Sequence, residues 1–98
     1  MSKVVIRNSA KEDLIAISAY TREQWGSQKR DIYLSKIDAV IQRVAASPKT
    51  GLSRDDVRKN YRSVKAGRHV LFYLETEDGI EIMRILHESM DLLRRLKC

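Results

Sequence analysis

Two glycine-containing turns between Tyr61 and Asp91 constrain the fold more than any other feature of the sequence. Asp78-Gly79 is a favoured pair for the two-residue type I′ turn of a β-hairpin, and Ala66-Gly67 is a second candidate for a tight turn. The residues around both pairs are rich in aliphatic and aromatic side chains, which favour strands. The segment therefore predicts a meander of three antiparallel strands.

The N-terminal half predicts a strand and then two helices. The strand lies between Lys3 and Asn8 and holds three consecutive β-branched residues. Apolar side chains then recur at spacings of three and four, as in amphipathic helices. The two apolar stripes comprise Ala10, Leu14, Ile17, Tyr20 or Thr21 and Trp25 in the first helix, and Tyr33, Ile37, Val40 or Ile41 and Val44 in the second.

The expected helix ends make the two helices a hairpin. Ser9 and Glu12 have the spacing of a capping box, and Gly26 suits the left-handed residue that ends a helix. Ser27 is the expected cap of the second helix, which Ser47-Pro48 closes. Helices joined by so short a link fold back on each other. Residues 1–98 are therefore expected to form one α+β domain: a strand, a two-helix hairpin and a three-stranded antiparallel meander, with a short C-terminal helix or tail.

Two-residue turns would also fix which side chains share a face of the sheet. They place Val70 opposite His87 and Phe72 opposite Ile85, on a face apolar enough to receive the helices. In this register the two histidines point to opposite faces, although a three-residue turn would reverse that. The other face would stay open, with four polar side chains above an apolar floor: Arg62, His69, Tyr73 and Arg84. Long basic side chains could cover such a face, but we favour a partner.

Charge and composition indicate the class of partner. The chain carries a net charge of +6 and has a pI near 9.7, which predicts attraction to nucleic acid, an anionic surface or an acidic protein. We expect a cytoplasmic protein without internal disulfides, because there is one cysteine, and without a membrane span, because no apolar run is long enough.

The sequence contains no recognisable metal, nucleotide or nucleophile motif. One cysteine and two histidines eighteen residues apart do not make a metal site, so no cofactor is expected. The enzyme class that remains is RNA cleavage, which needs a proton acceptor, a proton donor and cations. Its candidates are His69, His87, Tyr73, Arg62 and Arg84. For Arg84 we favour an ion pair, with Asp91 or with an acidic residue of the first helix.

The ordered set of motifs resembles the ParE toxins of the RelE/ParE superfamily, the toxic halves of bacterial toxin–antitoxin pairs. The similarity covers nearly the whole chain, and its most specific part is the ending from Arg84 to Asp91. The other matching positions are Asp13-Leu14, Ile17, Tyr20-Thr21, Trp25-Gly26, Tyr33, Ser47-Pro48, Gly51, Asp55, Tyr61-Arg62, Gly67, His69 and Phe72-Tyr73.

The resemblance implies a function and two macromolecular partners. It implies a toxin that traps DNA gyrase on cleaved DNA, and a ParD-type antitoxin whose disordered acidic segment folds onto the toxin. The alternative is a ribosome-dependent messenger-RNA endonuclease of the RelE type. Those enzymes typically have an arginine directly after the histidine of the middle strand, where this chain has Val70. A third hypothesis is a binding module without toxicity.

We assign two sets of residues to the expected partners. The polar residues of the open sheet face would bind the antitoxin: Arg62, His69, Tyr73 and Arg84. The C-terminal segment would bind the target through Met90, Leu93, Arg94, Arg95 and Lys97, although its alternative role is to close one edge of the core.

Overall fold

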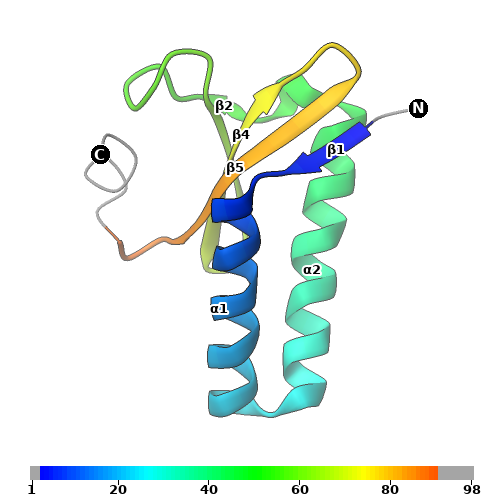
Figure 1. Cartoon of the computed structure of the whole chain (residues 1–98), viewed down its shortest axis with the longest axis vertical. Helices are drawn as coiled ribbons and strands as arrows, with labels where there is room; N and C mark the ends of the chain where they lie inside the picture. The colour runs from blue at the N-terminus through cyan, green and yellow to red at the C-terminus, as the bar shows by residue number, and fades with distance from the viewer. Residues whose placement is uncertain (1–2, 91–98) are drawn as a thin grey trace.

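The computed structural model describes residues 3–90. Helices α1 (Asn8–Trp25) and α2 (Ser27–Ala46) form a hairpin on one face of a five-stranded sheet (Figure 1). The strands run in the order β1-β5-β4-β3-β2, and a short 3-10 helix, η1 (Pro48–Thr50), follows α2. Their bounds are Lys3–Ile6 for β1, Leu52–Ser53 for β2, Arg62–Ala66 for β3, His69–Glu75 for β4 and Gly79–His87 for β5. The predicted α+β architecture is confirmed, while the expected C-terminal helix or tail lies outside the described residues.

The N-terminal strand β1 pairs in parallel with β5, the last described strand. Gly79 faces Lys3 so closely that a Cβ atom on the glycine would collide with the backbone of Lys3. The prediction that Asp78-Gly79 forms a type I′ turn is wrong, because Glu75 pairs with Ile80 and Gly79 begins β5. Glycine is required here for a close approach of two backbones.

The turn between β3 and β4 lies one residue later than predicted. Gly67 has a φ of +61° and Arg68 follows it, so Ala66 pairs with His69. A Cβ atom on Gly67 would lie 2.7 Å from Cε1 of Tyr33, which packs against the turn. The register of this hairpin therefore shifts by two positions, and each residue faces a new partner. Because side chains alternate with a period of two, those of β3 and β4 that were predicted to share a face still share it.

A β-bulge between β4 and β5 changes the arrangement of the histidines. Phe72 pairs with Arg84 but Tyr73 pairs with Ile82, which leaves Met83 as an extra residue. One extra residue reverses the facing of everything beyond it. His69 is therefore directly opposite His87, and the prediction that the two histidines point to opposite faces is wrong.

The helices cover the opposite face of β4 from the one we expected. The main core joins Leu71, Tyr73 and Ile82 to side chains of both helices, including Ile37 and Ile41. The face that was predicted to receive the helices instead forms a smaller cluster of Phe72, Met83, Leu86, Val57 and Tyr61. Every residue of β4 from Val70 to Leu74 is apolar or aromatic, so alternation alone did not distinguish its faces.

The ends of the helices combine two confirmed predictions with two wrong ones: Ser47-Pro48 closes α2 as expected, whereas the expected serine caps do not form. Gly26 has a φ of +91°, and its N–H bonds to the carbonyl of Arg22, as expected for a glycine that ends α1. Neither helix has a side-chain cap. The Ser9 hydroxyl donates instead to the Met83 carbonyl at 3.0 Å and holds the start of α1 against β5. Neither α1 nor α2 is apolar enough to cross a membrane.

Candidate functional site

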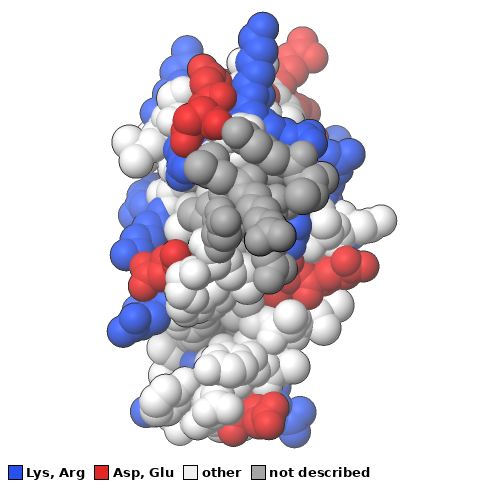
Figure 2. Space-filling view, turned by 90° about the vertical axis from the view of Figure 1, so that its left-hand side faces the viewer, with Lys and Arg blue, Asp and Glu red and all other residues white. Residues whose placement is uncertain are grey.

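A groove of about 900 Å³ lies beside the closed end of the helical hairpin. The two helices, the turn between β3 and β4 and the end of β5 form its walls, and we call it the aromatic groove. The closed end of the hairpin is at the bottom of Figure 1, and in the turned view of Figure 2 the surface there is largely uncharged. The lining residues are Ala16, Ile17, Tyr20, Thr21, Trp25, Lys29, Ile32, Tyr33, Lys36, Arg68, His69, His87, Ser89 and Met90.

Large apolar side chains are unusually exposed in this groove. Tyr20, Trp25 and Ile32 are each more than 60% exposed, and Met90 is 38% exposed. The first two belong to the apolar stripe predicted for the first helix, yet they project beyond the sheet instead of entering the core. Clustered exposure of this kind marks a binding surface more often than scattered single residues do.

Positive charge surrounds the apolar surface. Lys29, Lys36 and Arg68 line the groove, and none of the described residues that line it is acidic. The ammonium group of Lys29 lies 5.3 Å from the ring centroid of Trp25, a cation–π contact. An occupant with apolar and acidic side chains matches this combination.

Two histidines form the floor of the groove. The rings of His69 and His87 meet edge to face, with centroids 5.1 Å apart. The Tyr33 hydroxyl lies 2.6 Å from Nδ1 of His69 and also accepts the N–H of Arg68 at 3.0 Å. Nδ1 of His87 accepts the N–H of Ser89 at 3.1 Å and contacts its hydroxyl at 2.7 Å.

The backbone N–H of Ser89 determines where the neutral His87 ring carries its proton. A backbone N–H only donates, so Nδ1 of His87 is an acceptor and the proton is on Nε2. The Tyr33 hydroxyl lies 2.6 Å from Nδ1 of His69 and 3.5 Å from the Ala66 carbonyl, so the tautomer of His69 depends on which of these two acceptors receives the Tyr33 proton. Burial, and then the charge of His87, lowers the pKa of His69.

Two of the predicted antitoxin-binding residues hold a loop in place. Tyr73 is fully buried, and its hydroxyl accepts the Gly51 N–H at 2.9 Å and donates to the Pro48 carbonyl at 2.7 Å. Arg62 donates to the Gly51 carbonyl at 2.8 Å. A side chain on Gly51 would collide with the Tyr73 hydroxyl. The expectation that Tyr73 and Arg62 stand on an open face is therefore wrong.

Arg84 forms the ion pair that we favoured. Its Nε and Nη2 atoms donate to the two carboxylate oxygens of Asp13 in α1, at 2.8 and 3.1 Å. The same carboxylate accepts the N–H of Ile85 at 2.9 Å, where β5 extends past the end of β1. The hydrogen bond to Asp13 raises the pKa of Arg84. Arg84 thus joins α1 to β5 and does not belong to an open polar face.

The structure brings together a different set of residues from the one predicted. Of the four residues assigned to the antitoxin, only His69 lines the aromatic groove, and Met90 joins it from the set assigned to the target. Leu93, Arg94, Arg95 and Lys97 lie outside the described residues. The sequence analysis did not select Lys29, Ile32 or Lys36 as site residues. The feature that could have indicated them was Ile32, a large apolar residue outside the apolar stripe of its helix.

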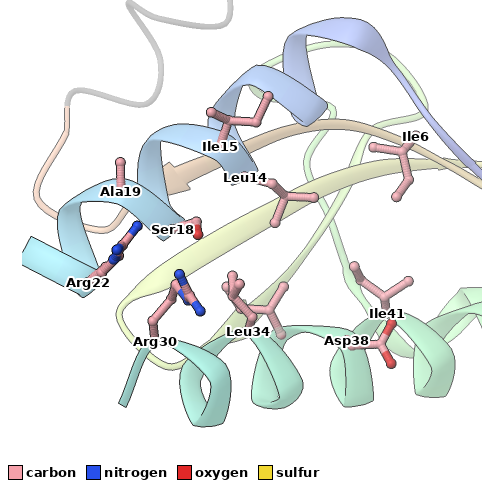
Figure 3. Close-up of a pocket in the computed structure, with 11 residues that line it drawn as sticks. Ile6, Leu14, Ile15, Ser18, Ala19, Arg22, Arg30, Leu34, Asp38 and Ile41 are labelled. Atoms are coloured by element: carbon pink, nitrogen blue, oxygen red, sulfur yellow. The ribbon is translucent and has the colours of Figure 1, made fainter. Parts of the chain in front are cut away.

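A second hollow, of about 520 Å³, lies between the two helices (Figure 3). Leu14 of α1 and Leu34 of α2 point into it, and Arg22 and Arg30 lie together at one end. Apart from Asp38 and these arginines its lining is apolar or uncharged, and it contains no histidine or aromatic side chain. The aromatic groove, with its imidazoles and exposed aromatic rings, is therefore the better candidate for a functional site.

Comparison with known proteins identifies the family. Residues 4–92 match the family described as ParE toxin of type II toxin–antitoxin system, parDE. The chain belongs to the ParE toxin family. It is 36% identical to Toxin ParE1 of Mycobacterium tuberculosis over 97% of this chain and 98% of that protein. It is 30% identical to Toxin ParE of Escherichia coli, over 98% and 94% of the two chains.

The fold of this ParE family member also occurs in a solved structure described as the chromosomal ParDE TA system from P. aeruginosa. The TM-score is 0.76 at 18% sequence identity, and the similarity covers 89% of this chain and 96% of that one. This similarity supports the fold, and the family match over residues 4–92 confirms the resemblance to ParE toxins inferred from the sequence. Its coarse consequence is also supported, namely that this is the toxin component of a ParDE-type pair.

Proposed function

We propose that this ParE family member stops bacterial growth by poisoning DNA gyrase, which it traps on cleaved DNA, and that a ParD-type antitoxin neutralises it. The observation that carries the proposal is the family match over residues 4–92. The net charge of +6 supports a toxin that works next to DNA and is countered by an acidic protein. Such a role places the protein in the cytoplasm.

The gyrase proposal predicts trapped DNA breaks. Micromolar toxin added to gyrase, ATP and supercoiled plasmid should give linear DNA once detergent and protease release the enzyme, because the toxin stabilises the cleaved intermediate. Agarose gels measure this product. Unbroken DNA together with unchanged supercoiling activity would contradict the proposal, and unimpaired growth after induced expression would favour a binding module without toxicity.

The C-terminal segment remains our proposed target-binding region. Changing Arg94 and Arg95 to alanine should reduce trapped breaks at least tenfold, since cationic side chains near DNA contribute to affinity. A matched control changes Arg22 and Arg43, two exposed arginines of the helices, and should leave trapping within twofold. Equal losses in the two variants would indicate a general effect of charge instead of a local contact.

We propose that the antitoxin docks in the aromatic groove. Four of the seven exposed large apolar side chains among the described residues lie there: Tyr20, Trp25, Ile32 and Met90. The lysines and Arg68 around them suit an acidic segment that folds on binding. Of the predicted antitoxin residues, His69 is placed to contact it directly. Arg62 and Arg84 would affect antitoxin binding only indirectly, because Arg62 holds the loop at Gly51 and Arg84 holds α1 against β5.

The paired histidines favour a second candidate function, RNA cleavage. Two imidazoles 5.1 Å apart, with Tyr33 and Arg68 beside them, provide a proton acceptor, a proton donor and a cation. Against it, Val70 occupies the position expected for an arginine and packs in the cluster on the opposite face of the sheet. In a translation extract this alternative predicts messenger cleavage that His87→Ala abolishes, whereas the gyrase proposal predicts intact messenger with either protein.

A further inference from the structure

The aromatic groove presents two ring nitrogens, Nε2 of His69 and Nε2 of His87, that the described protein itself does not use. The neutral His87 ring carries its proton on Nε2, as the Ser89 N–H at its Nδ1 requires, and His69 carries one there whenever Tyr33 donates to its Nδ1 or the ring is charged. Among the described residues neither Nε2 has a hydrogen-bond partner, yet no buried side-chain nitrogen there is unsatisfied. Both Nε2 atoms are therefore accessible to solvent, in a groove that both rings line.

We propose that Nε2 of His69 and Nε2 of His87 together form a subsite that receives one carboxylate side chain of the docked antitoxin segment. The inference rests on the proposed docking of the antitoxin in the aromatic groove. The ring centroids are 5.1 Å apart, and in the proposed complex each Nε2–H would donate a charge-assisted hydrogen bond of about 2.8 Å to the same carboxylate. Once the antitoxin segment covers the exposed aromatic side chains, water is excluded from the subsite and such bonds become stronger.

The carboxylates near His69 are already paired with other cations, so a carboxylate of the antitoxin can favour protonation of the histidine pair. Lys29 and Lys36 of α2 and Arg68 of the turn are cationic, whereas Asp13 of α1 and Glu88 after β5 are anionic. Glu88 is already paired with Lys65 at 2.8 Å and with Arg68 at 3.6 Å, and Asp13 with Arg84. The Tyr33 hydroxyl of α2 is hydrogen-bonded to the ring and adds no charge.

Proton uptake gives the subsite a definite pH dependence. In the free protein, burial keeps the pKa of His69 below its ordinary value, so the ring is neutral at pH 7. A carboxylate against the ring favours the charged form, so the pKa in the complex is higher than in the free protein. Binding then takes up a proton, and affinity rises as the pH falls through the window between the two values. Aspartate and glutamate side chains with ordinary pKa values do not titrate between pH 6 and pH 8.

Calorimetry with an intact ParD-type antitoxin tests the inference directly. Binding should be five- to tenfold tighter at pH 6 than at pH 8, and experiments in buffers of different ionisation enthalpy should show proton uptake. The variant with His69→Gln and His87→Gln keeps polar groups in the groove but does not titrate there. It should lose the difference between the two pH values and bind without proton uptake.

A second pair of variants separates the subsite from a purely structural role of His69. Asparagine at position 69 retains an acceptor for Tyr33 but removes the donor on the groove side, and glutamine does the reverse. His69→Asn should therefore weaken binding at pH 8 about fivefold more than His69→Gln. If the ring only supported Tyr33, the order would be the opposite, and that result would overturn the inference.

An experiment without the antitoxin keeps the test independent of the docking proposal. Imidazole resonances of the full chain are followed by NMR against pH in sodium acetate and in sodium chloride of equal ionic strength. Acetate should raise the apparent pKa of at least one ring and perturb both. Unchanged titration in acetate, or pH-independent binding of an antitoxin that still docks, would overturn the inference and leave the proposed function intact. A response to inorganic phosphate alone would also overturn it and would favour the RNA-cleavage alternative.

Discussion

Replacing Asp13 by alanine should lower the free energy of unfolding by about 2–3 kcal/mol, because one carboxylate satisfies both Arg84 and the N–H of Ile85. Its side chain is only 15% exposed, so water does not fully replace the lost partner. For a domain of this size the melting temperature should fall by roughly 10–20 °C. Thermal and denaturant unfolding followed by circular dichroism measure both quantities.

Two further variants define the origin of that loss. Asp13→Asn keeps an acceptor for the Ile85 N–H but removes the charge, so it should cost about half as much as the alanine variant. Glu23→Ala removes an exposed carboxylate from the same helix and should change stability by less than about 0.5 kcal/mol. An Asp13→Ala protein as stable as the Glu23→Ala control would show that the link between α1 and β5 contributes little.

Substituting glutamate for both Trp25 and Ile32 should weaken antitoxin binding at least about 100-fold, or roughly 2.7 kcal/mol. Both side chains are more than 60% exposed in the free toxin, so their replacement removes apolar contacts with the partner and leaves the core unchanged. The new charges also repel an acidic segment. Calorimetry or surface-based binding assays measure the affinity, and thermal unfolding verifies that the variant is folded.

The chain offers a matched control for this experiment. Ile15 and Leu52 are 69% and 73% exposed but do not line the aromatic groove. Changing both to glutamate adds the same charge to a similarly exposed apolar pair, and binding should stay within about threefold of the wild type. If the control variant loses as much affinity as the groove variant, the antitoxin docks elsewhere or responds only to net charge.

The order of the helices and strands could be predicted from local sequence patterns, whereas the face of the sheet on which each side chain lies could not. The apolar spacing of the helices and the glycine at position 26 act within a few residues, and both were interpreted correctly. The facing of His69 and His87 depends on a single extra residue, Met83, in a strand whose sequence shows no break in its pattern. Because β4 is apolar on both faces, nothing in its composition favoured one face over the other.

The candidate site was missed for a related reason. The alternation of side chains in the predicted register placed Arg62 and Tyr73 on an open face, yet each finds its partners on the short loop around Gly51. Those contacts join residues 11 to 25 positions apart, and local patterns do not predict them. Conversely, Tyr20 and Trp25 fit the apolar stripe of a helix, but α1 extends past the sheet and leaves them exposed.

The parallel pairing of β1 with β5 has a consequence for synthesis of the protein. Lys3 to Ile6 pair with Gly79 to Ile82, and Asp13 forms its ion pair with Arg84, so both depend on residues that are translated much later. A growing polypeptide emerging from the ribosome therefore has an unpaired β1 until Gly79 to Ile82 have been translated. Assembly of the toxin thus depends on residues that are synthesised long after β1.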